Sequence, residues 1–235
     1  MIKVLRVVLR GRMAHFRKVY SNSTSLSYYF PPRTTVLGIV AAALGLPRDS
    51  YYDKLNQLNV GVSAVTPLRK LTVGEDILDT DYANTTKLRG LSNRVPTTKE
   101  LILPYRENFL GYSIYLHPYS SEMVQAFKNP AFPLSLGTAN MLTWTEAIEE
   151  LECTEVGEGD SEQTRRVEGA VPSSVRVEFS EGIQLTLEDG VPTTFQVGRV
   201  PGKLANYYFS VGGTTYQVRG KFRGALCGDR VIAFL

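Results

Sequence analysis

The chain has 235 residues, of which 43% are hydrophobic, and a formal net charge of +3. This length and composition indicate a soluble globular protein with a sizeable core, built as one large domain or as one domain with a smaller appendage. No apolar stretch approaches the roughly 20 residues of a membrane span, and residues 1–12 lack the cleavage site of a secretion signal.

Charge is distributed unevenly along the chain. The first 48 residues hold eight basic side chains and no acidic one, residues 146–168 hold nine acids, and six bases face one acid from Gly198 onward. Two basic ends that fold together would form the positive surface of a polyanion-binding protein. The simpler alternative is that each charged run is merely solvated.

The two cysteines, Cys153 and Cys227, are 74 positions apart. This spacing matches neither a metal site nor a disulfide framework, so we expect two unpaired thiols and a cytoplasmic protein. No motif for a metal or another cofactor is visible, and we expect none to be bound.

The first half of the chain alternates strands and helices. Residues 2–9 predict a central strand covered on both faces, and the irregular, aromatic-rich stretch up to Phe30 predicts a long ordered loop. A helix should begin near Thr34 or Thr35, whose hydroxyls can cap it, and stop at Gly45 with small residues along one face. The next expected elements are a short helix within 50–58, a strand at 60–65, an exposed excursion at 66–100, a strand at 111–117 and a helix at 121–128.

This order of elements fits a ferredoxin-like α+β sandwich over residues 1–145. Residues 145–153 read as helical, within an acidic connection assigned to 146–172. Residues 173–235 predict a small C-terminal β segment with two hairpins, one turning at residues 180–182 and a sharper one turning at Gly212-Gly213.

One loop system combines cations with flat rings, in the series Arg12, Phe16, Arg17, Lys18, Tyr20, Tyr28 and Arg33. Unpaired bases stack on such rings while Lys and Arg neutralise phosphates, so the pattern favours nucleic-acid binding. The alternative is that the rings are core residues beneath a long loop. His15 and His117 are the only histidines, and either could serve a metal-independent ribonuclease together with Tyr20, Tyr28 or Lys18.

The series that begins at Gly11, GRMAHFRKVYSNSTSLSYYFPPRTTVLGIVAAALGL, resembles the N-terminal signature of the CRISPR-associated Cas-five family. Members are RAMP-superfamily subunits of type I Cascade complexes. In that signature a glycine ends the first strand, a Phe-Arg pair follows, and a Ser/Thr-rich loop leads through Pro-Pro-x-Thr-Thr into a Leu-Gly helix. Looser matches, PTTKELILPYRENFLGYSIYL and FKNPAFPLSLG, extend the resemblance over about the first 140 residues.

The resemblance implies a ferredoxin-like (RRM/RAMP-type) α+β domain with an inserted thumb hairpin at about 66–100. It also implies a non-catalytic subunit that binds the 5′ handle of a CRISPR RNA. Its partners would be the backbone RAMP subunit, the large subunit and, through the complex, target DNA; no membrane is expected. On this basis the RNA-binding residues are Arg12, His15, Phe16, Arg17, Lys18, Tyr20, Tyr28, Arg33, Thr34 and Thr35, with Arg89, Arg94 and Lys99 on the thumb.

The details look closest to type I-B systems of antiviral defence. One family branch, in type I-C systems, cleaves precursor RNA with a tyrosine, a lysine and a histidine. The match to that set is poor, because the chain has no Lys-His pair and Leu116 and Pro118 flank His117. A metal-independent endoribonuclease acting on repeat RNA is therefore the second hypothesis. The third is a protein scaffold that docks through the acidic segment 146–168.

Overall fold

A computed structural model describes residues 1–21, 24–79, 82, 84–157 and 163–235, in which strands outnumber helices. The strands are β1 (Ile2–Gly11), β2 (Phe16–Arg17), β3 (Ser27–Tyr28), β4 (Asn59–Ala64), β5 (Leu68–Leu78), β6 (Arg94–Pro104), β7 (Leu110–His117), β8 (Leu134–Ser135), β9 (Leu142–Val156), β10 (Thr164–Glu168), β11 (Ala170–Pro172), β12 (Arg176–Glu178), β13 (Leu185–Pro192), β14 (Leu204–Ser210), β15 (Tyr216–Arg219), β16 (Gly224–Cys227) and β17 (Arg230–Ala233). The helices are α1 (Arg33–Ala43), α2 (Tyr52–Leu55), α3 (Thr85–Leu88), α4 (Ser121–Lys128) and the 3-10 turn η1 (Val197–Arg199).

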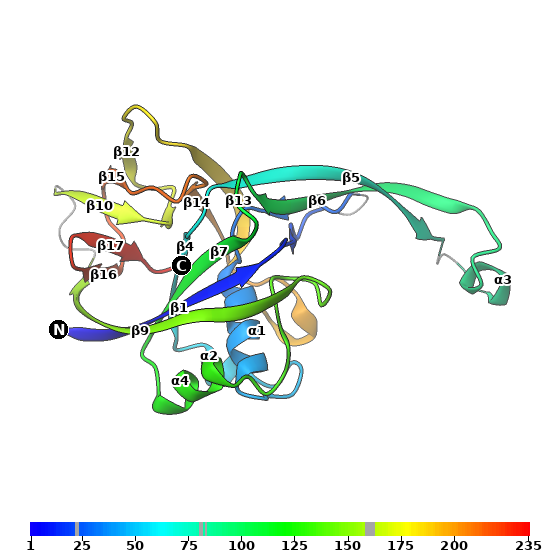
Figure 1. The fold of residues 1–235 in the computed structure, drawn as a ribbon, viewed down its shortest axis with the longest axis horizontal. Helices are drawn as coiled ribbons and strands as arrows, with labels where there is room; N and C mark the ends of the chain where they lie inside the picture. Colours follow the sequence, from blue (N-terminus) through cyan, green and yellow to red (C-terminus); the bar gives the residue numbers. More distant parts are fainter. Residues whose placement is uncertain (22–23, 80–81, 83, 158–162) are drawn as a thin grey trace.

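Four strands in the order β9-β1-β7-β4 form one end of the main sheet, with β4 at its edge, and each is antiparallel to its neighbours. They are called here the central strands, because buried clusters lie on both of their faces. Helix α1 connects β1 to β4, and α4 lies between β7 and β9 in the chain, so two βαβ units interleave their strands. Beyond β9 the same sheet continues through β16, β17, β10, β15 and β12. The helices α1, α2 and α4 lie together on one side of the central strands (Figure 1).

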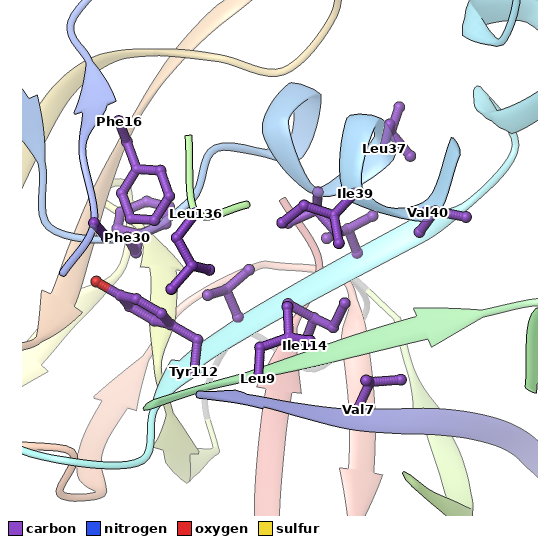
Figure 2. Close-up of a cluster of buried hydrophobic side chains, with 14 of the residues drawn as sticks. Val7, Leu9, Phe16, Phe30, Leu37, Ile39, Val40, Tyr112, Ile114 and Leu136 are labelled. Carbon is purple, nitrogen blue, oxygen red and sulfur yellow. The ribbon is translucent and has the colours of Figure 1, made fainter. Parts of the chain in front are cut away.

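Strand β1 is buried on both faces, as its apolar sequence predicts. Val7 and Leu9 face α1, where they belong to one cluster with Ile39, Val40 and other buried side chains (Figure 2). Val4 belongs to a different buried cluster on the opposite face, with Tyr115, Cys153, Ala225, Ile232 and Phe234. The C-terminal strands thus cover the face that the helices leave open.

Helix α1 ends as expected but begins differently. Its N-cap is Pro32, no side chain caps it, and the carbonyl of Pro32 accepts from the amides of Thr35 and Val36, so the predicted threonine cap is wrong. At the other end Gly45 has φ +72°, its amide donates to the carbonyl of Ala42, and the amide of Leu46 donates to that of Ala41. These two hydrogen bonds form a Schellman motif, which explains why the helix stops there.

The excursion after β4 is a long hairpin, called here the arm, made of β5, α3 and β6. Its strands pair in register from Leu68 opposite Pro104 to Leu78 opposite Arg94. At the tip, the side chain of Asn84 accepts from the amide of Lys87 and caps α3. The arm projects far from the rest of the molecule (Figure 1), and its buried apolar residues, Leu68 and Ile102, lie near its base.

Residues 145–153 are not helical, which corrects the sequence prediction. They belong to β9, which pairs with β1 along almost its whole length. Glutamate, alanine and leucine favour a helix locally. A strand is favoured instead because it pairs with the edge of β1 that β7 leaves open, and because Arg6 pairs with Glu149 and Arg10 with Glu146. The acidic connection is therefore mostly strand, in β9 and β10; its residues 158–162 lie outside the described residues. The division at 145 and 172 stays a prediction.

The cysteines form a disulfide, contrary to the sequence expectation. Cys153 in β9 and Cys227 in β16 have Cα atoms 4.4 Å apart, because β16 pairs with β9 just beside them. The spacing of 74 residues in the sequence could not show that two strands would bring the sulfurs together. The cytoplasmic location, which was inferred from the same cysteines, stays a prediction.

The C-terminal segment is β-rich, but the two expected hairpins do not form. Strand β12 pairs with β15 while β13 pairs with β14, and β14 and β15 lie in different sheets. Gly212-Gly213 therefore marks a change of sheet. At Gly213, with φ +69°, a Cβ would lie 3.0 Å from the carbonyl oxygen of Ala64, so this turn packs against the end of β4.

Gly169 gives a direct test of how closely the C-terminal strands pack on β4. It has φ +83°, and a Cβ there would lie 2.0 Å from the carbonyl oxygen of Val62, whereas Gly182, with φ +84°, has open space around it. Both substitutions by alanine strain the backbone, by about 1 kcal/mol, but only Gly169→Ala adds a clash with backbone, worth about 1–3 kcal/mol more. We expect urea unfolding to show the larger loss for Gly169→Ala. Equal losses would contradict the close packing.

Candidate nucleic-acid interface

A groove of about 630 Å³ lies beside the exposed side of α1. It is bounded by β2, α1, the turn after α1, the segment around β8 and the segment around η1. Its lining includes His15, Phe16, Arg17, Thr34, Thr35, Gly38, Ala41, Ala42, Arg48, Tyr51, Phe132, Gly137, Phe195 and Arg199. Among the described residues, this lining holds three arginines and no acidic side chain, while the carboxylate of Asp49 lies beside two of these arginines.

Small residues of α1 make the bottom of the groove. Gly38, Ala41 and Ala42 line it, and the phenol oxygen of Tyr51 lies 3.3 Å from where a Cβ of Gly38 would be. At the end of the helix another backbone does come close, as the small-residue face predicts. The amides of Ala131 and Phe132 donate to the carbonyls of Ala43 and Ala42 at 3.0 and 3.2 Å. The missing side-chain bulk thus creates the space of the groove.

Three guanidinium groups line the groove. Arg17 follows Phe16 on β2, is exposed, and donates to the carbonyl of Ser21 at 2.9 Å. Arg48 and Arg199 come from separate turns, and the carboxylate of Asp49 joins them, with Oδ1 2.7 Å from Arg199 Nε and Oδ2 3.5 Å from Arg48 Nε. Hydrogen bonds from Tyr52 and Arg199 lower the pKa of Asp49, so this carboxylate stays ionised and holds the two turns together.

His15 borders the groove, but only 2% of its surface is exposed. Its Nδ1 is 2.7 Å from the carbonyl oxygen of Glu100, and because a carbonyl only accepts, Nδ1 carries the proton. Burial lowers the pKa of the imidazole, so His15 is neutral near pH 7. Gly137 is held against it, with φ +99° and a Cβ position 1.8 Å from the backbone oxygen of His15, which no larger residue could adopt.

The groove thus collects part of the predicted RNA-binding set, namely His15, Phe16, Arg17, Thr34 and Thr35. Phe16 is nevertheless almost fully buried and packs edge-to-face on Tyr112, with ring centroids 5.7 Å apart. Thr34 is also buried, with its hydroxyl 3.5 Å from the carbonyl of Pro192. Arg17 and Thr35 keep the larger accessible surface.

A separate cluster contains Lys18, Tyr20 and Tyr28. Two carboxylates of β13 neutralise the charge of Lys18 in this cluster. Lys18 Nζ is 3.0 Å from Glu188 and 3.3 Å from Asp189, and the phenol of Tyr20 donates to Asp189 at 2.8 Å. Tyr28 is fully buried and donates to the carbonyl of Gly190, and burial raises its pKa to about 12. These side chains fasten the long loop to β13. Burial of Tyr28 and the ion pairs of Lys18 correct the expectation that these two lie open to RNA, whereas Tyr20 keeps 47% of its surface exposed and its RNA contact stays a prediction.

Arg33 is also internal. Its guanidinium donates to the carbonyls of Thr193, Asn56 and Leu58 at 2.9, 2.6 and 3.0 Å, and 93% of the residue is buried, with 7% exposed. It therefore joins the start of α1 to the segments after α2 and after β13. A phosphate contact for Arg33 is not compatible with this position.

The other predicted residues lie away from the groove. Arg12 follows the last residue of β1, and its guanidinium is 5.9 Å from the ring centroid of Phe109. Arg89 closes α3 at the tip of the arm, Arg94 opens β6, and Lys99 lies 3.7 Å from Glu75 across the arm. The sequence analysis did not name Arg48, Phe132, Phe195 and Arg199 as site residues. Arg48 and Arg199 carried a signal there, because they belong to the basic N-terminal run and to the basic run that starts at Gly198.

Among the described residues, no group of three or more His, Cys, Asp or Glu side chains is placed to hold a metal ion. Within the same residues, no helix has the length and apolar character needed to cross a bilayer.

Known structures share this fold. A crystal structure of a CRISPR protein from Archaeoglobus fulgidus aligns with a TM-score of 0.61 and 13% identity, covering 99% of each chain. A chain of the type III-B Cmr-beta complex bound to cognate target RNA and AMPPnP aligns with a TM-score of 0.53 and 9% identity, over 90% of this chain and 86% of that one. A chain of a CRISPR RNA-guided surveillance complex aligns with a TM-score of 0.49 and 17% identity, over 96% of this chain and 91% of that one. The first two likenesses define a strand-rich α+β protein of a fold found among CRISPR proteins.

The sequence defines the family. The family model described as CRISPR-associated protein (Cas_Cas5) matches residues 4–203, which is most of the chain. The protein therefore belongs to the CRISPR-associated Cas-five family, as the signature after Gly11 indicated. No curated protein sequence matches the chain.

The buried position of Arg33 makes a prediction about stability. Arg33→Met leaves three carbonyls without their donor, so we expect urea unfolding to show a loss of about 3 kcal/mol. Arg48→Met, at an exposed position, should change the free energy of unfolding by less than about 0.5 kcal/mol. If Arg33→Met were as stable as Arg48→Met, the assignment of Arg33 to the interior would be wrong.

Proposed function

We propose that the protein is a non-catalytic subunit of a type I CRISPR Cascade complex and that it binds the 5′ handle of the guide RNA in the groove. The observation that carries this proposal is the groove itself, whose lining in the described part of the chain includes three arginines and no acid. Family membership supports the complex as the setting, and an end of a single-stranded RNA is a ligand that such a groove suits.

The fold supports the same proposal. The strand order β9-β1-β7-β4, with α1 and α4 as connections, matches the order expected of a ferredoxin-like domain and so supports a RAMP-type fold. The arm would be the thumb, which reaches the backbone subunit with Arg89 and Arg94 exposed near its tip. The large subunit and target DNA would be contacted within the complex.

The groove offers separate partners for phosphates and bases. Arg17, Arg48 and Arg199 would neutralise phosphates, and the hydroxyl of Thr35 is an additional donor. Phe132, with 51% of its surface exposed, and Phe195 present rings on which an unpaired base can stack. The bottom of glycine and alanine lets the strand approach the helix closely.

The chemistry of the side chains favours binding without cleavage. His15 is buried, neutral and held by Glu100, and His117 lies elsewhere with its Nδ1 2.8 Å from the carbonyl of Lys3. Burial raises the pKa of Tyr28 to about 12, and the pKa of Lys18 is raised by Tyr20 and Glu188, which outweigh its burial. Lys18 and Tyr28 therefore stay protonated near neutral pH. Neither of them lines the groove, so neither can act there as a general base beside His15.

Salt dependence tests the role of the groove. We expect the full chain to bind a repeat-derived RNA with a free 5′ handle, and the binding to weaken steeply with salt in fluorescence anisotropy. Replacing Arg17, Arg48 and Arg199 together by Gln should reduce the slope of log affinity against log salt by about 2, at about 0.7 per phosphate contact. The matched replacement of Arg176, Arg219 and Arg223 is the control. An unchanged slope in the groove variant would refute the proposed site.

Cleavage is tested separately. Incubation of the same repeat RNA with the protein in EDTA should leave the RNA intact on a denaturing gel, because His15, the histidine at the groove, is buried and hydrogen-bonded to Glu100. Cleavage that His15→Ala or His117→Ala abolishes would instead establish the metal-independent ribonuclease.

A further inference from the structure

A second surface combines exposed rings with arginines at the end of the central sheet. Strand β1 ends there while β7 and β9 begin, since Gly11 pairs with both Leu110 and Thr143. The neighbouring residues Arg12, Tyr105, Arg106, Phe109 and Trp144 are called here the platform. None of them lines the groove.

The rings of the platform are accessible and ordered by one another. Trp144 and Phe109 expose 45% and 37% of their surface, and they meet edge-to-face with centroids 5.1 Å apart and planes at 85°. Tyr105, at the base of the arm, is 55% exposed. Single exposed rings are ordinary on a protein surface, but several exposed rings in one patch are typical of a contact surface.

The charges of the platform decide what kind of partner it fits. Arg12 lies over Phe109 and Arg106 over Tyr105, with guanidinium-to-centroid distances of 5.9 and 5.1 Å. In the described part of the chain, neither guanidinium has a carboxylate within 4 Å, whereas the nearby Arg10 is already paired with Glu146. Two uncompensated cations beside flat rings match a strand that alternates phosphates with bases.

We propose that the platform is a second nucleic-acid site, which takes unpaired bases of a single strand by stacking on Trp144 and Phe109. Arg12 and Arg106 bind the flanking phosphates. Stacking tolerates any base, so this site holds a strand without reading its sequence. The ligand is single-stranded RNA or DNA, and it contacts the protein at a place distinct from the groove.

Trp144 is the only tryptophan of the chain, so its fluorescence reports on this site alone. We expect a uridine oligonucleotide of about twelve residues, within the ~4–16 nucleotides of such sites, to quench Trp144 in a saturable way at low salt. A duplex of the same length should quench weakly, because its bases are already stacked. Equal quenching by the duplex, or none by the single strand, would overturn the proposal.

Variants separate the platform from the groove. Phe109→Leu should weaken the titration about fivefold or more, and Arg12→Gln should reduce its salt slope by about 0.7, whereas Phe179→Leu, at a distant exposed phenylalanine, should change neither. Trp144→Leu, followed by anisotropy of a labelled oligonucleotide, should weaken binding similarly. The triple groove variant should keep the quenching. If the groove variant lost it while the platform variants did not, the platform would not be the site.

A comparison of two oligonucleotides, one of RNA and one of DNA, distinguishes which nucleic acid the platform binds. Equal quenching by oligo(U) and oligo(dT) would support a site for any single strand, DNA included, and a preference for oligo(U) would support guide RNA through its 2′-hydroxyls. A Trp144 spectrum that ignores both strands and shifts only with other subunits of the complex would make the platform a protein interface and refute the proposal.

Discussion

The position of β1 between β7 and β9 is the constraint on which the rest of the structure depends. Both edges of the strand are paired, and both of its faces are covered, by α1 on one side and by the C-terminal strands on the other. Residues far apart in the sequence are therefore held in one frame. The ends of β1 also fix the start of the long loop that leads to Arg17 and so set one wall of the groove.

Two kinds of arginine result from this frame, and composition does not distinguish them. Arg33 is buried against three carbonyls and serves the fold, while Arg17, Arg48 and Arg199 lie where solvent and a polyanion can reach them. Lys18 is intermediate, since the carboxylates of β13 already neutralise it. The function proposed for the groove therefore depends on which cations stay exposed to solvent, even where a carboxylate lies beside them as Asp49 does beside Arg48 and Arg199, more than on the number of cations.

The sequence was most informative where a signal was local. The apolar run of β1, the stop at Gly45 and the helix at 121–128 were all predicted and all observed. Residues 145–153 were misassigned because a long-range partner, β1, outweighs their helical propensity, and the disulfide and the change of sheet at Gly212-Gly213 also depend on strands distant in sequence. At the groove, Arg17 was predicted, but Arg199 and Phe195 come from a segment whose place beside α1 only the tertiary structure provides.

The arm has a consequence for how the protein would join a larger assembly. In the described residues of the arm, apolar side chains are buried near its base, and a two-stranded ribbon of this kind gains little stability from its outer half. Its eleven-residue strands span about 35 Å, at roughly 3.4 Å per residue. Amide protection against hydrogen exchange should therefore decline from base to tip in the free protein, and a neighbouring molecule that grips the tip would supply the missing rigidity.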